Sequence, residues 1–134
     1  NPQKVLEVGT GSGYQAAVLS HLVPQVFTVE RIDELLKFAR RRFHSLRLNN
    51  ICVRYADGHL GWPSQAPFDG IMVTAAAQSV PEELLEQLNV GGLLVIPIEK
   101  MGMQRLISVR RTEDGYEETD LCGVVFVPML SGLA

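Results

Sequence analysis

Three glycines alternate with other residues directly after the first apolar segment of the chain. Residues Lys4–Val8 have the composition of a β-strand, and Gly9, Gly11 and Gly13 follow it at two-residue intervals. Because glycine carries no Cβ, such a loop can turn sharply and approach a ligand closely. A strand that passes through a loop of this kind into a helix is typical of nucleotide-binding α/β folds.

Strand-like and amphipathic segments then alternate along most of the chain. The expected strands cover residues 4–8, 26–30, 51–55, 68–73, 93–97, 105–111 and 117–127, and the expected helices cover 14–22, 32–46 and 81–88. The strand at 93–97 is apolar on both faces and is expected inside the sheet. Residues 57–67 are expected to form a loop, and Glu113-Asp114-Gly115 indicates a hairpin turn. The pattern predicts an α/β fold, a doubly wound Rossmann-like sheet that is mostly parallel, with an antiparallel hairpin at one edge.

Composition limits both the size of the protein and its partners. The 134 residues, 46% of them hydrophobic, suffice for one globular domain over residues 1–134. Twelve basic and 15 acidic residues leave a net charge of −3, which favours neither nucleic acid nor an anionic membrane. The longest uncharged stretch is broken by glycine and proline, so no membrane span is expected. Cys52 and Cys122 lie far apart and indicate free thiols in a reducing compartment.

The glycine spacing distinguishes between two nucleotide-type ligands. Tyr14 stands where the dinucleotide fingerprint G-x-G-x-x-G requires its third glycine. Glu7 instead completes the pattern E-x-G-x-G-x-G, the form used by enzymes that bind S-adenosylmethionine (AdoMet). AdoMet carries a sulfonium cation, which an acid suits, whereas the same acid would repel a diphosphate. An NAD-dependent oxidoreductase is therefore disfavoured, and a tight turn without a ligand is the simpler alternative.

Three more candidate positions follow the ends of predicted strands. Glu30 ends the second strand, at the distance from the glycine loop where a carboxylate binds ribose hydroxyls. Asp57-Gly58 follows the third strand, where the acid can accept a hydrogen bond from an adenine amino group, and Thr74 follows the fourth beside small residues that leave room for the methionine end. The alternative is a solvated charge for Glu30, an Asp-Gly turn for Asp57 and a closely packed helix start for Thr74.

Other chemistries do not fit the spacing. Ser12 lacks the flanking glycines of a nucleophile elbow. His21, His44 and His59 do not cluster with acids or cysteines, so no metal site is expected. The basic run from Lys37 to Arg47 is interpreted as a solvated helix face, with RNA binding as the alternative.

Longer stretches around these positions resemble the bacterial type of the protein-L-isoaspartate O-methyltransferase family. The resemblance runs from Val5 to about Leu130 and rests on Val5–Gln15, Val29–Arg31, Asp57–Gly58, Pro67–Ala76, Gly91–Pro97 and Val125–Leu130. It implies a methyltransferase sheet and AdoMet as methyl donor. The implied cofactor-binding residues are Glu7, Gly9, Thr10, Gly11, Ser12, Gly13, Glu30, Arg31, Asp57, Gly58 and Thr74.

The resemblance also implies an activity. Such an enzyme moves a methyl group from AdoMet to the free carboxylate of L-isoaspartyl residues in damaged peptides and proteins, which is a repair reaction. The substrate carboxylate is the nucleophile, so no catalytic residue and no metal is expected in this chain. A cytoplasmic location, a monomeric intact enzyme, and no nucleic-acid or membrane partner are further implications.

The N-terminus departs from the family pattern. The family has a helical segment before the first strand that carries a hydroxyl residue and part of the substrate site, and we expect this chain to be N-terminally truncated. AdoMet binding is then expected to persist while turnover is weak or lost, and uncovered apolar sheet surface is expected to cause self-association. The alternatives are an adenosyl-binding core without activity, or a methyltransferase for small molecules or RNA.

Overall fold

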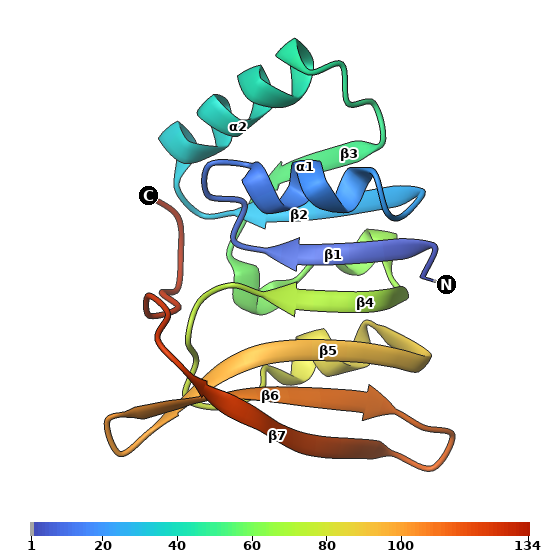
Figure 1. The fold of residues 1–134 in the computed structure, drawn as a ribbon, viewed down its shortest axis with the longest axis vertical. Coiled ribbons are helices and arrows are strands. Elements are labelled where there is room, and N and C mark those ends of the chain that lie inside the picture. Colours follow the sequence, from blue (N-terminus) through green and yellow to red (C-terminus); the bar gives the residue numbers. More distant parts are fainter. Residues whose placement is uncertain (1) are drawn as a thin grey trace.

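Seven β-strands form a single sheet in the computed structural model, which describes residues 2–134 (Figure 1). Asn1, the first residue of the predicted domain, lies outside the described part. The strands are β1 (Lys4–Val8), β2 (Gln25–Glu30), β3 (Ile51–Tyr55), β4 (Phe68–Val73), β5 (Leu88–Lys100), β6 (Met103–Arg111) and β7 (Tyr116–Val124). The helices are α1 (Tyr14–Ser20), α2 (Asp33–Ser45) and α3 (Glu82–Glu86), with 3₁₀ turns η1 (Gly58–Leu60) and η2 (Pro63–Gln65).

The strand order is β3-β2-β1-β4-β5-β6-β7. Strands β1 to β5 run parallel, whereas β6 is antiparallel to both β5 and β7. The chain builds outward from β1 to β3 and then returns to place β4 on the other side of β1. The carboxyl ends of β1 and β4 therefore lie at a topological switch point, where α/β sheets bind their ligands. The predicted fold class, including the hairpin of β6 and β7, is confirmed.

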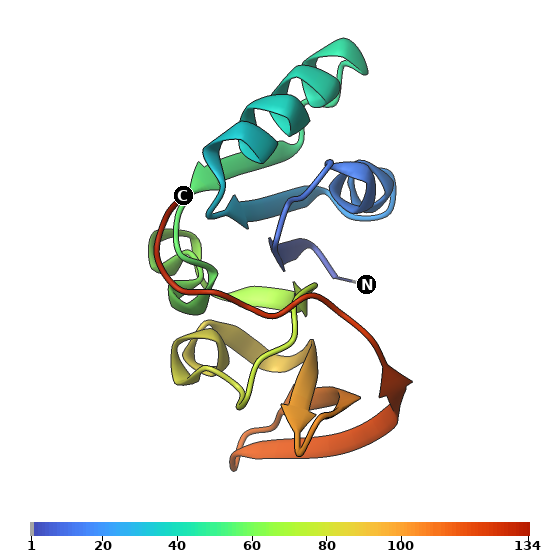
Figure 2. The same cartoon turned by 90° about the vertical axis from the view of Figure 1, so that its left-hand side faces the viewer.

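Helices cover both faces of the sheet, as a doubly wound fold requires. Val5 and Val26 point to one face, where they pack with Ala16 of α1 and with Ala39 and Phe43 of α2. On the other face a larger apolar cluster joins strand residues such as Leu6 and Phe27 to Leu84 of α3 and to Trp62 before η2. Figure 2 shows α1 and α3 on opposite sides of the sheet.

Several predicted boundaries are wrong. β5 begins at Leu88 rather than residue 93, because Leu88 already pairs with Phe68 before a register shift, so Gly91 and Gly92 lie inside the strand. The predicted third helix accordingly ends at Glu86. The region 57–67 is more ordered than a loop. The side chain of Gln87, which follows α3, holds this region in place: it accepts a hydrogen bond from Trp62 N (2.8 Å) and donates one to Leu60 O (2.9 Å).

Residues after β7 form a strap rather than a continuation of the strand. The predicted seventh strand extends to Val127, but β7 ends at Val124. The segment 125–134 then crosses the carboxyl ends of the strands and reaches the beginning of α2 (Figure 1). It pairs with the chain after β4 through an isolated parallel bridge between Ala76 and Pro128. The strap therefore adds a wall to the edge of the sheet where the predicted site residues lie.

Two further features concern the described residues as a whole. Cys52 and Cys122 are exposed and unpaired, in agreement with the prediction of free thiols. No helix within residues 2–134 has the length and apolarity needed to cross a membrane.

Candidate functional site

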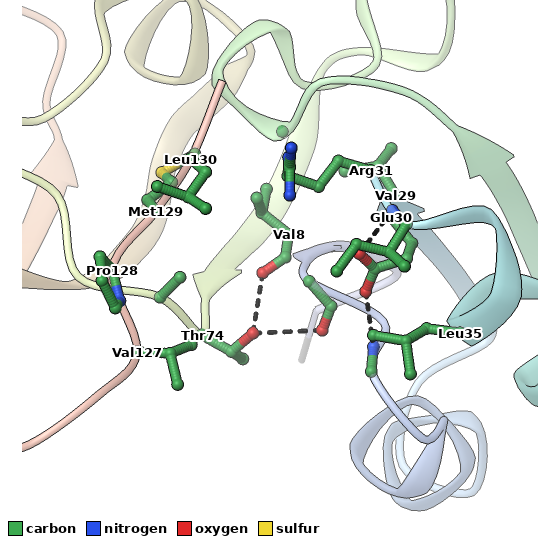
Figure 3. A pocket seen from close by; sticks show the side chains of 15 residues that line it. Val8, Val29, Glu30, Arg31, Leu35, Thr74, Val127, Pro128, Met129 and Leu130 are labelled. Carbon is green, nitrogen blue, oxygen red and sulfur yellow. Dashed lines mark hydrogen bonds between the residues drawn. The ribbon is translucent and has the colours of Figure 1, made fainter. Parts of the chain in front are cut away.

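A cavity of about 490 Å³ lies at the switch point, between the carboxyl ends of the central strands and the strap (Figure 3). Its size is within the range of small-molecule and cofactor sites. Its walls are mostly apolar, with few polar groups. The lining residues are Val8, Gly9, Gly11, Val29, Glu30, Arg31, Ile32, Leu35, Gly58, Thr74, Ala75, Val127, Pro128, Met129 and Leu130.

The glycine loop forms the floor of this cavity and cannot carry side chains at two places. Gly9 has a φ of 102°, and a Cβ there would lie 2.4 Å from Oγ1 of Thr74. Gly13 has a φ of 87° and would meet the ring of Phe43 at 2.8 Å. Gly11 differs, because a Cβ built on it meets nothing within 4 Å and its backbone lines the cavity. Gly9 and Gly13 are therefore required by packing, and Gly11 gives access to the cavity.

Glu30 is the acidic side chain on the cavity wall. Its Oε1 accepts a hydrogen bond from Gly11 N at 2.9 Å, and its Oε2 accepts one from Ile32 N at 3.0 Å. Only 6% of the residue is exposed. Backbone donors from two segments thus hold the carboxylate in one orientation, and each oxygen keeps a lone pair for a further donor. The arrangement suits a ligand that presents neighbouring hydroxyl groups.

Glu7 lies beneath the glycine loop rather than on the cavity wall. It is fully buried, and its Oε1 accepts a hydrogen bond from Thr28 Oγ1 at 2.7 Å. Thr28 shares a second hydrogen bond of 2.6 Å with Thr10 of the loop. Burial raises the pKa of Glu7 to about 7; the hydrogen bond from Thr28 opposes this increase and the nearby charge of Glu30 adds to it. Glu7 therefore acts on the loop through Thr28 and Thr10.

Asp57 lies at the rim, with both carboxylate oxygens already hydrogen-bonded. Oδ1 accepts from His59 N (2.9 Å) and lies 3.0 Å from His59 Nδ1, while Oδ2 accepts from Gly132 N (3.0 Å). Burial raises the pKa of Asp57, but the hydrogen bonds from Gly132 and His59 outweigh that effect and lower it below its usual value. The next residue, Gly58, does line the cavity, and a Cβ there would lie 2.3 Å from Cγ1 of Val8.

Thr74 and Arg31 complete the polar part of the wall. Thr74 Oγ1 donates to Val8 O (2.9 Å) and lies 3.1 Å from Gly9 O, so its hydroxyl ties the end of β4 to the glycine loop. Arg31 follows β2, and its Nε donates to Gly132 O at 3.1 Å. Figure 3 shows both side chains at the cavity, on opposite sides of it.

The predicted site residues divide into two groups. The structure brings Gly9, Gly11, Glu30, Arg31, Gly58 and Thr74 together on the cavity wall. Glu7, Thr10, Ser12, Gly13 and Asp57 lie outside the lining set, beneath the loop, within it or at the rim.

Sequence reasoning missed the apolar part of the wall. The sequence pattern indicates only helical periodicity at Ile32 and Leu35, and the family resemblance includes Val127–Leu130 without assigning them a role. No group of three potential metal ligands from His, Cys, Asp or Glu occurs within residues 2–134. The described cavity therefore offers shape, apolar contact, one oriented carboxylate and one guanidinium.

The family model and the curated relatives point to one family. The family model for protein-L-isoaspartate(D-aspartate) O-methyltransferase matches residues 1–134. A protein-L-isoaspartate O-methyltransferase of Halorhodospira halophila is 57% identical over 131 residues, which are 98% of this chain and 60% of that protein. The chain thus spans about 60% of the length of such curated relatives.

Solved structures of the same description share the fold. A protein-L-isoaspartate O-methyltransferase superposes with a TM-score of 0.91 at 29% identity, covering 98% of this chain and 43% of the other. A Plasmodium falciparum protein described with the same activity, solved in complex with S-adenosyl-L-homocysteine, gives a TM-score of 0.80 at 26% identity, covering 96% of this chain and 66% of the other.

Proposed function

Because the chain belongs to the protein-L-isoaspartate(D-aspartate) O-methyltransferase family, we propose that its cavity binds AdoMet and that the protein methylates isoaspartyl residues. The observation that carries this proposal is the oriented carboxylate of Glu30 beside the open backbone of Gly11, inside a mostly apolar cavity. We propose that residues 1–134 form one AdoMet-binding domain.

The residues on the wall fit the parts of AdoMet. Glu30 would accept hydrogen bonds from the ribose hydroxyls, each worth about 1.5–3 kcal/mol because the acceptor is charged. Gly9 and Gly11 would let the backbone approach the ligand, and Ile32 would pack against the adenine. Thr74 marks the side of the cavity nearest the end of β4, where the methionine part would lie.

The residues outside the lining set would act indirectly. Glu7 and Thr10 would hold the glycine loop in place, and Gly13 would let α1 pack closely against Phe43. Asp57 would accept a hydrogen bond from the adenine amino group in addition to the one that it already accepts from Gly132 N. Ser12 is exposed and would contribute backbone geometry rather than a side-chain contact.

The reaction requires little acid–base chemistry from the chain. AdoMet, when bound, supplies a methyl group that its sulfonium already activates. An isoaspartyl carboxylate has an ordinary pKa of about 4, so it is ionised at neutral pH and needs no general base. The chain's contribution is to orient the bound groups and to exclude water, and such positioning can supply about 7–11 kcal/mol of a reaction barrier. The apolar walls from Val29, Leu35 and Met129 suit that role.

The proposed substrates are isoaspartyl-containing peptides and proteins. The activity for which the relatives are named supports this class, and we propose no nucleic-acid or membrane partner. The free thiols of Cys52 and Cys122 support a cytoplasmic location, because such thiols persist in reducing compartments. We propose that the intact enzyme is a monomer.

The experiment is a methyl-transfer assay with labelled AdoMet and two peptides that differ only in an isoaspartyl or aspartyl linkage. Labelling of the isoaspartyl peptide alone supports the proposed activity. Equal labelling of both peptides, or labelling of RNA in a parallel reaction that contains RNA in place of peptide, contradicts it. If neither peptide is labelled but S-adenosylhomocysteine binds, this chain is an adenosyl-binding core without turnover, which is the second candidate function.

A further inference from the structure

The strap has two parts that are held in different ways. The first part, residues 127–129, is anchored beside the end of β4, where Ala76 N donates to Val127 O and Met129 N donates to Ala76 O, both at 2.7 Å. Met129 also packs against the larger apolar cluster. This part is a wall of the cavity, together with Leu130. The second part, residues 131–134, we name the tip.

Backbone atoms of the tip bind the ends of two strands. Gly132 N donates to Asp57 Oδ2 at 3.0 Å, and Gly132 O accepts from Arg31 Nε at 3.1 Å. Ala134 N donates to Arg31 O at 2.6 Å, and Ala134 O accepts from Asp33 N and Tyr55 Oη, both at 2.9 Å. The tip therefore bridges the segments that follow β2 and β3.

The position of these contacts relates the tip to the cavity. Leu130, directly before the tip, lines the cavity. Arg31, which donates a hydrogen bond to the tip, also lines it, and so does Gly58, the residue after Asp57. The tip thus spans the distance from the end of the strap wall to the opposite wall at Arg31. Figure 1 shows this last segment rising along the carboxyl ends of the strands to the beginning of α2. Residues 131–134 are not among the lining residues, so the tip passes outside the wall to which Leu130, Arg31 and Gly58 belong.

The tip is held by hydrogen bonds without buried apolar contacts. Its residues are exposed, and Leu133 retains 54% of its accessible surface. The two bonds of Gly132 are also exposed to water. Segments held in this way open locally at a small free energy, whereas segments packed into a core open only with larger parts of the protein. The tip can therefore detach while the wall at Val127 and Met129 stays in place.

We propose that the tip is a gate for exchange of the adenosyl ligand and that Asp57 is its latch. The gate rests on the proposed function of the cavity, since it controls passage of the ligand that the cavity binds. In the closed state Gly132 bridges Asp57 and Arg31. When these bonds break, the tip swings away on the anchored wall, and ligand enters or leaves between Arg31 and Gly58. Closing then shields the bound ligand from water.

The test compares exchange rates of S-adenosylhomocysteine in the parent chain and in Gly132→Pro. Proline removes the N–H that Asp57 accepts and cannot adopt the φ of 78° found at Gly132. Leu133→Ala is the matched control, because it changes an exposed side chain of the tip and leaves its backbone bonds in place. Association and dissociation rates are measured by surface plasmon resonance.

A gate that limits passage in both directions gives a specific result. Both rates in Gly132→Pro are expected to rise together, by about threefold to tenfold for the loss of one water-exposed bond to a charged acceptor, while Kd stays unchanged. Leu133→Ala should match the parent. Unchanged rates would show that the tip is a static wall. A rise in the association rate alone would show that the tip competes with the ligand for its site, and a rise in the dissociation rate alone would show that the tip contacts the bound ligand. Each of these results overturns the gate.

A second measurement needs no ligand and separates the gate from the proposed function. Hydrogen exchange of the ligand-free parent chain should show slowed amides at Gly132 and Ala134. In Gly132→Pro, which has no amide at position 132, the amide of Ala134 should become fast, while the amides of Ala76 and Met129 stay protected. If S-adenosylhomocysteine fails to bind both chains, the proposed function fails, and this pattern still decides whether the tip opens independently. Fast exchange at Gly132 in the parent, or joint loss of protection at Met129, contradicts the two-part strap.

Discussion

Glu7→Gln should change how the stability of the protein depends on pH. Glu7 is fully buried, and its Oε2 has no hydrogen-bond partner within the described residues. Its pKa rises from 4.5 to about 7 on folding, mainly through burial. A carboxyl with a raised pKa keeps its proton in the folded state while the unfolded chain loses it. Stability is therefore fully present below pH 4.5 and falls as the pH rises towards 7.

The size of this effect follows from the difference between the two pKa values. The difference, about 7 minus 4.5, is about 2.5 pH units. At about 1.4 kcal/mol per unit, it corresponds to about 3 kcal/mol lost between pH 4.5 and 7. Glutamine is neutral at every pH and can still accept from Thr28, so it removes this dependence. Its NH₂ group lacks a partner at the place of Oε2, which lowers stability by an amount that is independent of pH.

The assay is urea unfolding followed by circular dichroism at several pH values between 4.5 and 8. The free energy of unfolding of Glu7→Gln relative to the parent should rise with pH by about 3 kcal/mol and level off above pH 7. Glu34→Gln, an exposed acid in the first turn of α2, serves as the control and should show no such rise. A difference between Glu7→Gln and the parent that stays constant with pH would refute the reasoning.

Three other predictions concern packing, the loop network and association. Gly58→Ala places a Cβ 2.3 Å from Val8 Cγ1 and should lower the free energy of unfolding in urea by about 1–3 kcal/mol. The double variant Gly58→Ala/Val8→Ala should recover stability, and no recovery would contradict the steric cause. Thr28→Val removes the hydroxyl between Glu7 and Thr10 and should cost about 1–3 kcal/mol by the same assay, and an unchanged stability would contradict the network. The apolar groove formed by Val5, Leu22 and Leu93 should cause self-association in light scattering, and a single monomeric species would contradict this expectation.

The elements that could be predicted from sequence are those with strong local patterns. The strands around Leu6, Phe27 and Ile71 are short apolar runs between turns, and α2 repeats its apolar residues at helical spacing. Their alternation determines the parallel order and therefore the switch point at Gly9 and Thr74. The same pattern predicts Glu30 at the end of the second strand, and the structure shows it there, on the cavity wall.

Other parts depend on contacts between residues far apart in the chain. The length of β5 follows from pairing of Leu88 with Phe68, and the order of residues 57–67 follows from the side chain of Gln87. The strap has neither strand nor helix periodicity, so its position over the cavity could not be read from local pattern. Glu7 shows a different limit. Its position in a ligand-binding pattern predicts contact with the ligand, but the structure buries it completely, with Thr28 of the neighbouring strand as its hydrogen-bond partner.

The most direct test of the central claim is a calorimetric titration of S-adenosylhomocysteine into this chain and into Glu30→Ala. The proposed site predicts one ligand per chain, and an affinity at least about tenfold weaker in Glu30→Ala, as expected for hydrogen bonds to a charged carboxylate. Glu34→Ala, the exposed acid nearby, should bind like the parent. Binding that is equal in all three chains, or a folded chain that binds nothing, would contradict the assignment of the cavity as an adenosyl site.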